Sequence, residues 1–167
     1  PVSWDLWFNT RLEGKARCYV PLGEENNLRI ETAVDARKDT MAHRLVNGYF
    51  TFSPEDPPDK KEIRAAKAYI YPDTGFMAAF SEKQMLVIDF EKFPAETIHP
   101  EQALVEIYNR TATDARLNLL ELEYHSEYKQ LAPGESMTVS ETWYVVPYSG
   151  EETPEVQIEF LNDYFGN

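Results

Sequence analysis

The sequence predicts an all-β protein, an antiparallel β-sandwich with one short C-terminal helix. Short segments rich in Val, Ile, Tyr, Phe and Thr recur along the chain, tight-turn sequences separate them, and a credible helix start stands near the C-terminus. We expect strands near residues 3–12, 16–21, 28–34, 45–52, 66–71, 75–81, 84–91, 103–110, 116–125 and 136–146.

The turn sequences define how some of these strands connect. Residues 72–75, PDTG, combine a proline that presets φ with a glycine that can take positive φ, so we expect them to join 66–71 and 75–81 as a hairpin. A second tight connection is expected at 81–84. Proline followed by glycine at 133–134 is typical of a type II turn.

The C-terminal segment has the sequence of a helix start. Thr153 suits the N-cap and Pro154 the first helical position. Apolar residues then recur every four positions in a short helix near 154–164 that we expect to pack on the sheet: Val156, Phe160 and Tyr164. Alternation at Val156, Ile158 and Phe160 leaves a strand as the alternative.

Length and charge limit the classes of partner. The 167 residues predict a single domain over 1–167. Sixteen basic against 29 acidic residues give a net charge of −13, which repels a phosphate backbone and argues against nucleic acid as a partner. No apolar run reaches the roughly 18 residues of a membrane span, and no signal-peptide pattern is present.

The first residue and the cysteine content bear on location and cofactors. Pro1 fits a mature chain after signal removal or a fragment of a longer protein. We expect a periplasmic or secreted location, with the cytoplasm as alternative. Cys18 is the only cysteine, so neither an intrachain disulfide nor a Cys-based metal site is expected. Without an HExxH, EF-hand or glycine-rich phosphate motif, we expect no metal and no cofactor. Metal ligation by the clustered carboxylates Glu24 and Glu25, or Glu151 and Glu152, is the alternative.

The first candidate site is residues 4–11, WDLWFNTR. Side chains alternate between the two faces of a strand, so one expected face is apolar and belongs to the core: Trp4, Leu6, Phe8 and Thr10. The other face mixes an aromatic ring with polar groups: Asp5, Trp7, Asn9 and Arg11. We expect Trp7, Asn9 and Arg11 to line a ligand face.

The second candidate is residues 117–128, LNLLELEYHSEY. Alternation predicts one face with Asn118, Leu120, Leu122 and Tyr124, and another with Leu117, Leu119, Glu121, Glu123 and His125. Two carboxylates and an imidazole in a row are suited to general acid–base chemistry. The alternative is that these three side chains form the solvated side of an antiparallel sheet.

The third candidate is residues 103–110, ALVEIYNR. Ala103, Val105 and Ile107 form its apolar face. The other face carries groups that could bracket a polyol, because carboxylates and guanidinium groups bond hydroxyls while a ring covers C–H groups: Glu106, Tyr108 and Arg110. Cross-strand charge pairing on an exposed face is the alternative.

The order of motifs resembles the C-terminal half of an uncharacterised branch of the galactose-mutarotase-like, or aldose-1-epimerase-like, superfamily. The pieces are, in order, PVSWDLWFNTR, a YVP strand, GFMAAF with MLVIDFEKF, VEIYN, LNLLELE and LAPGESMTVSETWYV. The resemblance implies a supersandwich with a carbohydrate site on its concave face, where mutarotases use a histidine as acid and a glutamate as base. The chain has about half the usual length and lacks the asparagine–histidine motif of true mutarotases. Glu121 and Glu123 match the branch's "leLE" pattern, and Glu106 its "evY" pattern.

Three functions are therefore open. A carbohydrate-binding β-sandwich domain is the leading hypothesis, and an aldose-1-epimerase-like or glycoside-processing enzyme and a structural module of a larger extracytoplasmic protein are the alternatives. The residues expected to bind carbohydrate are Trp7, Asn9, Arg11, Glu106, Tyr108, Glu121, Glu123 and His125. Because half a sandwich leaves unpaired edges and apolar surface, we also expect self-association or pairing with an N-terminal segment.

Overall fold

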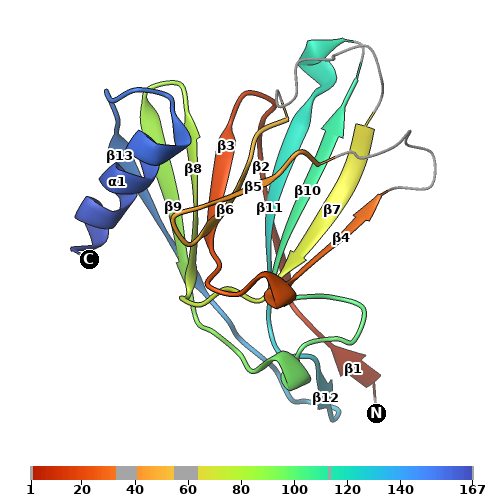
Figure 1. Cartoon of the computed structure of the whole chain (residues 1–167). Coiled ribbons are helices and arrows are strands. Elements are labelled where there is room, and N and C mark those ends of the chain that lie inside the picture. Colours follow the sequence, from red (N-terminus) through yellow and green to blue (C-terminus); the bar gives the residue numbers. More distant parts are fainter. Residues whose placement is uncertain (1, 33–40, 55–63, 113, 167) are drawn as a thin grey trace.

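The protein is an antiparallel β-sandwich with one C-terminal helix, as the sequence predicts (Figure 1). The computed structural model describes residues 2–32, 41–54, 64–112 and 114–166. Within them, no helix is long and apolar enough to cross a membrane.

Two large sheets and one small one contain all the described strands. The five-stranded sheet has the order β2 (Trp7–Glu13), β11 (Leu119–His125), β10 (Val105–Thr111), β7 (Arg64–Ile70) and β4 (Leu28–Thr32). The six-stranded sheet has the order β13 (Glu141–Pro147), β9 (Gln84–Phe90), β8 (Phe76–Ser81), β3 (Arg17–Pro21), β6 (Tyr49–Phe52) and β5 (Arg44–Val46). The small sheet pairs β1 (Val2–Trp4) with β12 (Lys129–Leu131). Short 3-10 turns are η1 (Glu25–Asn27), η2 (Ala95–Thr97) and η3 (Ala115–Leu117).

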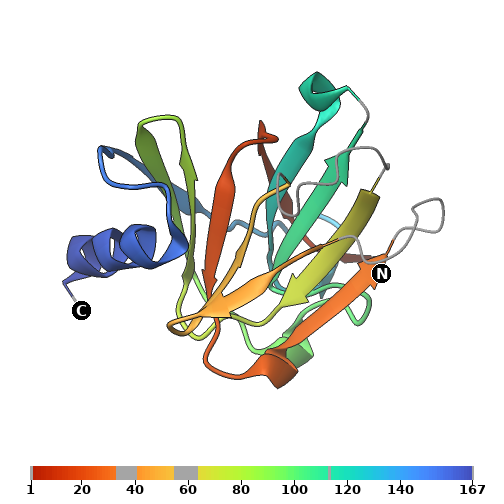
Figure 2. The same ribbon diagram turned by 45° about the horizontal axis from the view of Figure 1, so that its top comes forward.

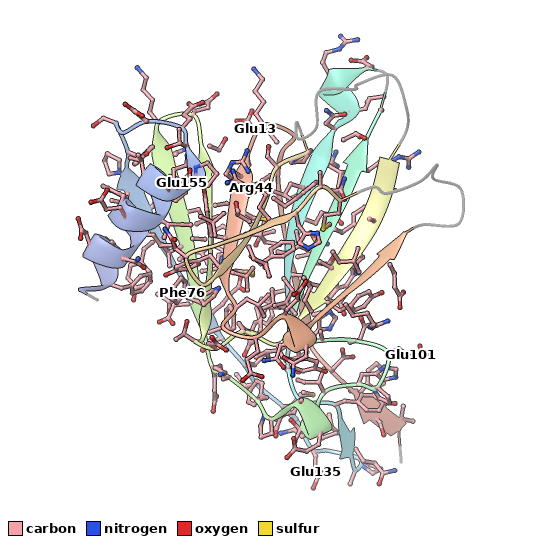
Figure 3. All side chains as sticks on the ribbon, in the orientation of Figure 1. Glu13, Arg44, Phe76, Glu101, Glu135 and Glu155 are labelled. Carbon is pink, nitrogen blue, oxygen red and sulfur yellow. The ribbon has the colours of Figure 1, made fainter. Side chains whose placement is uncertain are left out.

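The main core lies between the two large sheets, where side chains from both fill the space (Figure 3). Alternation along each strand supplies it, because every second residue points inward. Phe50 and Met77 from the six-stranded sheet are buried in the same cluster as Ile70, Ile107 and Leu122 from the five-stranded sheet.

The helix α1 (Pro154–Phe165) covers the other face of the six-stranded sheet (Figure 2). Ile158 and Leu161 are buried there beside Phe80, and the Tyr19 hydroxyl donates a hydrogen bond to Gln157 Oε1 at 2.5 Å. The layers are therefore helix, six-stranded sheet and five-stranded sheet, so the five-stranded sheet turns one face away from the core.

The predicted helix is present, but its predicted buried face is only partly right: Phe160 packs half-buried beside Phe80, whereas the fully buried residues are not the predicted ones. Thr153 is the N-cap residue and Pro154 opens the helix, although the Thr153 side chain makes no capping hydrogen bond. The residues buried against the sheet are Pro154, Gln157, Ile158 and Leu161, and the predicted contact Tyr164 is 41% exposed. Spacings of three and four together define a helix face, and spacing of four alone drifts around the helix.

One predicted hairpin is also wrong. Residues 72–75 do not join paired strands, because β7 pairs with β10 and β4 whereas β8 pairs with β9 and β3. The turn instead carries the chain from one sheet to the other: the amide of Asp73 donates to Pro21 O, and the Gly75 carbonyl accepts from Phe90 N. Its polar backbone is satisfied by neighbouring strands and not by a hairpin.

The other two turn predictions are confirmed. Strands β8 and β9 form an antiparallel hairpin in which Ser81 pairs with Gln84. Gly134 has a φ of 88°, and Glu135 N donates to Ala132 O across the turn. The predicted strand 45–52 is itself a hairpin, with β5 and β6 joined at Asn47 and Gly48, both at positive φ.

The first predicted strand is split, and this moves Trp4 out of the core. Leu6 N donates to Ser126 Oγ while Ser126 N donates to Leu6 O, which ends β1 before β2 begins. Trp4 pairs with Lys129 in the small sheet and is 56% exposed, so its predicted core position is wrong. Phe8 does pack on the main core, and Thr10 is buried.

Candidate functional site

The eight residues expected to bind carbohydrate lie on one face of the five-stranded sheet, the face turned away from the core. Residues paired in register on neighbouring strands share a face. The pairs here are Trp7–His125, Asn9–Glu123, Arg11–Glu121, Glu106–Glu123 and Tyr108–Glu121. Thr10, Leu122 and Ile107 alternate with them and are buried, so the predicted faces are confirmed within β2, β10 and β11.

Burial divides these residues into two groups. We call the exposed group the rim (Trp7, Asn9 and Arg11) and the buried group the pit (Glu106, Glu123 and His125). Trp7 is 58% exposed, and Asn9 and Arg11 are exposed as well. Glu106, Glu123 and His125 are instead buried, with exposures of 0%, 1% and 3%. The alternative of a solvated outer face is therefore wrong for Glu123 and His125, and that of an exposed face is wrong for Glu106.

Lys67 links the buried carboxylates. Its Nζ lies 2.7 Å from Glu106 Oε2 and 2.9 Å from Glu123 Oε2. Lys67 is paired in register with Tyr108, which places it on the same outer face from β7. Two carboxylates directly opposite each other on adjacent strands repel, so the shared ammonium group compensates their charge.

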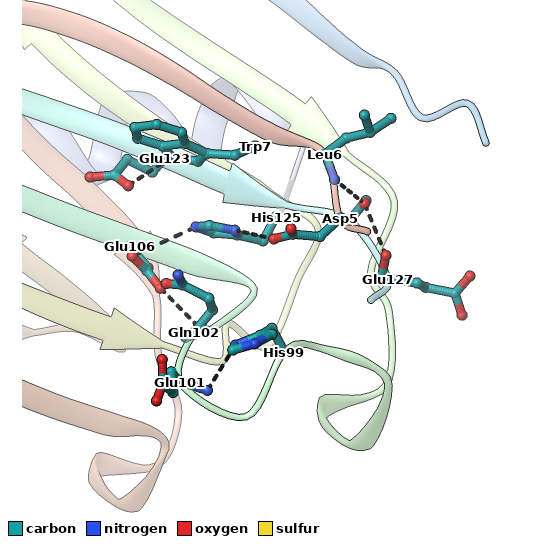
Figure 4. A network of polar contacts seen from close by, with 12 residues as sticks. Asp5, Leu6, Trp7, His99, Glu101, Gln102, Glu106, Glu123, His125 and Glu127 are labelled. Carbon is teal, nitrogen blue, oxygen red and sulfur yellow. Dashed lines mark hydrogen bonds and ion pairs between the residues drawn. The ribbon is translucent and has the colours of Figure 1, made fainter. Parts of the chain in front are cut away.

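Trp7 contacts two residues of the pit, Glu123 and His125. Its indole Nε1 donates to Glu123 Oε2 at 2.8 Å. The ring also stacks on His125, with 6.4 Å between ring centroids and 13° between planes. An exposed aromatic ring is thus held in one orientation by two contacts (Figure 4).

His125 stands between two carboxylates. Its Nδ1 lies 3.2 Å from Asp5 Oδ2, and its Nε2 lies 3.6 Å from Glu106 Oε2, an ion-pair distance beyond normal hydrogen bonding (Figure 4). Asp5 lies between β1 and β2, two residues before Trp7. The bond to Asp5 orients the imidazole so that Nε2 points toward Glu106.

Glu106 receives further bonds from the segment that precedes β10. Ala103 N donates to Glu106 Oε1 at 3.0 Å. The Gln102 side chain lies against the same carboxylate, and with its amide nitrogen turned inward it donates to Oε2 at 3.2 Å. Charge-assisted bonds of this kind stabilise an ionised carboxylate.

The two glutamates differ in their proton affinity. Burial works to raise the pKa of Glu106, but His125 and Lys67 outweigh it and hold that pKa below its ordinary value. Burial raises the pKa of Glu123 above its ordinary value despite the bonds from Lys67 and Trp7. Burial works to lower the pKa of His125, yet Glu106 and Asp5 raise it overall.

Two buried atoms of the pit have no hydrogen-bond partner among the described residues, Glu123 Oε1 and His125 Nε2. One atom from each of Glu106, Glu123 and His125 lies within 4.8 Å of the others, a spacing at which they could hold a metal ion. The arrangement can therefore accept a cation, transfer a proton, or hydrogen-bond a polar ligand.

Three members of the network were not predicted from the sequence: Asp5 as a partner of His125, Lys67 and Gln102. A signal for Lys67 was present, because Lys67 and Tyr69 alternate with Ala66, Ala68 and Ile70 in the predicted strand 66–71. That alternation predicts an outward polar side, but no local pattern tells which strand lies beside it.

Residues 1–146 match the family model described as domain of unknown function (DUF4380). The chain belongs to this family. No curated protein and no solved structure matches the chain significantly. The DUF4380 match includes every residue of the rim and the pit and ends before helix α1.

Proposed function

We propose that this DUF4380 domain binds carbohydrate on the outer face of its five-stranded sheet. The observation that carries the proposal is Trp7, an indole 58% exposed yet held by Glu123 and His125. A ring fixed before binding loses little conformational freedom when a ligand stacks on it, which favours affinity.

The residues around Trp7 supply the polar half of such a site. Asn9 and Arg11 follow it on β2, and Glu121 and Tyr108 continue the same face across β11 and β10. Amide, guanidinium, carboxylate and phenol groups offer both donors and acceptors to sugar hydroxyls. A mostly polar face with an exposed indole as platform suits a polyol better than an apolar ligand.

Binding is the function that the geometry supports better than catalysis. The acid–base groups that a mutarotase-like reaction needs, Glu106, Glu123 and His125, are each at least 97% buried. A sugar on the rim would meet Trp7 and Arg11 before these groups. The resemblance to the galactose-mutarotase-like superfamily is consistent with a sugar ligand and stays part of the proposal.

A glycan array followed by calorimetry with the best ligand tests the proposal. We expect wild-type protein to bind and Trp7→Ala to weaken binding by about tenfold or more, or about 1.4 kcal/mol. Trp143→Ala is the matched control, because Trp143 is 53% exposed but belongs to β13 of the other sheet. Failure to bind any glycan, or equal losses in the two variants, would contradict the proposal.

A further inference from the structure

The buried pit beneath Trp7 has the donor set of a metal centre. Glu106 comes from β10, and Glu123 and His125 come from β11, so three ligands sit on two neighbouring rigid strands. One donor atom of each lies within 4.8 Å of the others. Side chains buried this deeply are out of reach of a sugar on the rim, but donor atoms at this spacing could bind a single ion.

We propose that Glu106, Glu123 and His125 bind one divalent transition-metal ion of the Zn²⁺ or Co²⁺ class. The proposal does not depend on carbohydrate binding, because it concerns the buried groups and not the exposed rim.

Unpartnered buried atoms support the site independently of the clustering. Glu123 Oε1 is buried and has no hydrogen-bond partner among the described residues. His125 Nε2 is also buried, and its contact with Glu106 Oε2, at 3.6 Å, is longer than a normal hydrogen bond. Leaving such atoms unsatisfied is costly, and native proteins rarely do so without a reason. Both atoms are of the types that donate a lone pair to a metal.

The groups around the three ligands match the outer shell of known metal sites. A histidine ligand commonly donates its other ring N–H to a carboxylate, and His125 Nδ1 lies 3.2 Å from Asp5 Oδ2. The carboxylate ligands are likewise held: Trp7 Nε1 donates to Glu123, and Ala103 N donates to Glu106. These contacts fix the orientation of all three ligands before an ion arrives.

Donor chemistry selects the class of ion. Mg²⁺ and Ca²⁺ prefer oxygen ligands alone, whereas an imidazole with two carboxylates suits Zn²⁺ and its neighbours in the first transition row. Water would complete the coordination of an ion with three protein ligands.

Lys67 is the internal competitor for this ion. Its ammonium group lies within 2.9 Å of both carboxylates, the position that a cation would share. The Lys67 side chain is 25% exposed and is paired in register with Glu31 on β4, so its flexible stem can swing outward toward that carboxylate. Removing the ammonium group should therefore strengthen metal binding.

Calorimetric titration of chelator-treated protein with Zn²⁺ tests the site. We expect one ion per chain, binding weakened about tenfold or more in Glu123→Gln and in His125→Gln, and tighter binding in Lys67→Met. Glu121→Gln is the matched control, because Glu121 lies on the same strand and face outside the cluster and should leave the affinity unchanged.

Two results would overturn the site: no binding by both wild type and Lys67→Met, or equal losses in Glu121→Gln and Glu123→Gln, which would mean adventitious binding to surface carboxylates. If the ligand variants do not fold, anomalous diffraction from wild-type crystals grown with Co²⁺ decides. The ion should lie roughly 2.0–2.2 Å from His125 and the glutamate oxygens, and an ion found only elsewhere contradicts the proposal.

Discussion

Glu106 and Glu123 are paired across β10 and β11 and share the ammonium group of Lys67. Their pKa values nevertheless shift in opposite directions, down for Glu106 and up for Glu123. The difference follows from their other neighbours. His125 adds a second positive partner near Glu106, whereas Glu123 has an oxygen without any described hydrogen-bond partner. The pKa of Glu106 is therefore lower than that of Glu123, so Glu106 loses its proton more readily.

The sequence predicts on which face of a strand these residues lie, but not how deeply they are buried. Period-two alternation is a local property, so it correctly grouped Glu106 with Tyr108, and Glu121 with Glu123. Burial depends on what lies over each residue, and the cover comes from Trp7, Lys67 and Gln102, which are distant in sequence. The same limit explains Trp4: its alternation with Phe8 is real in the sequence, but neither Asp5 nor Leu6 belongs to a strand, so Trp4 and Phe8 lie on different strands.

The raised pKa of His125 predicts a pH-dependent stability. A histidine whose pKa is raised in the folded state binds its proton more tightly there, so its contribution is complete below the ordinary pKa of 6.5 and is lost as pH rises through the folded value. The thermal midpoint of wild type should therefore fall as pH increases from about 6.5. Glu106 and Glu123 also make stability depend on pH, Glu106 below the ordinary pKa of 4.5 and Glu123 around its raised pKa. The His125→Gln variant therefore identifies the part of the pH dependence that comes from the histidine.

Thermal melts across this pH range check the prediction. His125→Gln should lose the decline, while His99→Gln, outside the Glu106–Glu123 pair, should retain it. A wild-type midpoint that rises with pH above 6.5, or a decline that survives in His125→Gln, would contradict the assignment.

Among the secondary-structure elements, the positions of strands and turns were predictable from the sequence, whereas the pairing of the strands was not. Turn chemistry at 81–84 correctly predicts the β8–β9 hairpin, because such a short connection leaves antiparallel pairing as the simple solution. The PDTG turn at 72–75 has equally strong local signals, but its backbone bonds go to Pro21 and Phe90. A turn sequence fixes a local reversal and leaves open whether the next strand stays in the same sheet.

The helix α1 allows a direct comparison of the predicted and observed faces. Leu161 is fully buried against the six-stranded sheet, whereas Tyr164 is 41% exposed. We expect Leu161→Ala to lower the free energy of unfolding by about 2–5 kcal/mol through lost burial and the cavity left behind. Tyr164→Ala should cost about 1 kcal/mol or less. Urea denaturation measures both, and a loss in Tyr164→Ala as large as in Leu161→Ala would restore the face predicted from spacing of four.

At the scale of the molecule, the three layers give the large sheets different outer faces. Helix α1 packs on the six-stranded sheet through Ile158 and Leu161. The five-stranded sheet presents Trp7, Arg11 and Tyr108 over a buried cluster of charge. An antiparallel sheet commonly packs one face on the core and turns the other outward with polar side chains. The five-stranded sheet has this arrangement, and the candidate site lies on its outward face.

The edge strand β13 bears on the expectation of self-association. Trp143, Tyr144 and Val145 are 53%, 41% and 62% exposed, and β13 is the terminal strand of its sheet. Exposed apolar side chains along an unpaired edge favour pairing with another strand. Self-association, or pairing with a further segment, therefore stays a prediction of this fold.

The proposed ligand binding on the outer face of the five-stranded sheet can be followed through the indole N–H signals of the three tryptophans. Trp7 lies on that face, Trp143 lies on the far edge of the other sheet, and Trp4 lies in the small sheet. In ¹⁵N NMR titrations with a glycan selected on the array, we predict that the Trp7 signal moves saturably while those of Trp4 and Trp143 stay in place. A titration that moves Trp143 or Trp4 and leaves Trp7 unchanged would contradict the proposed binding face.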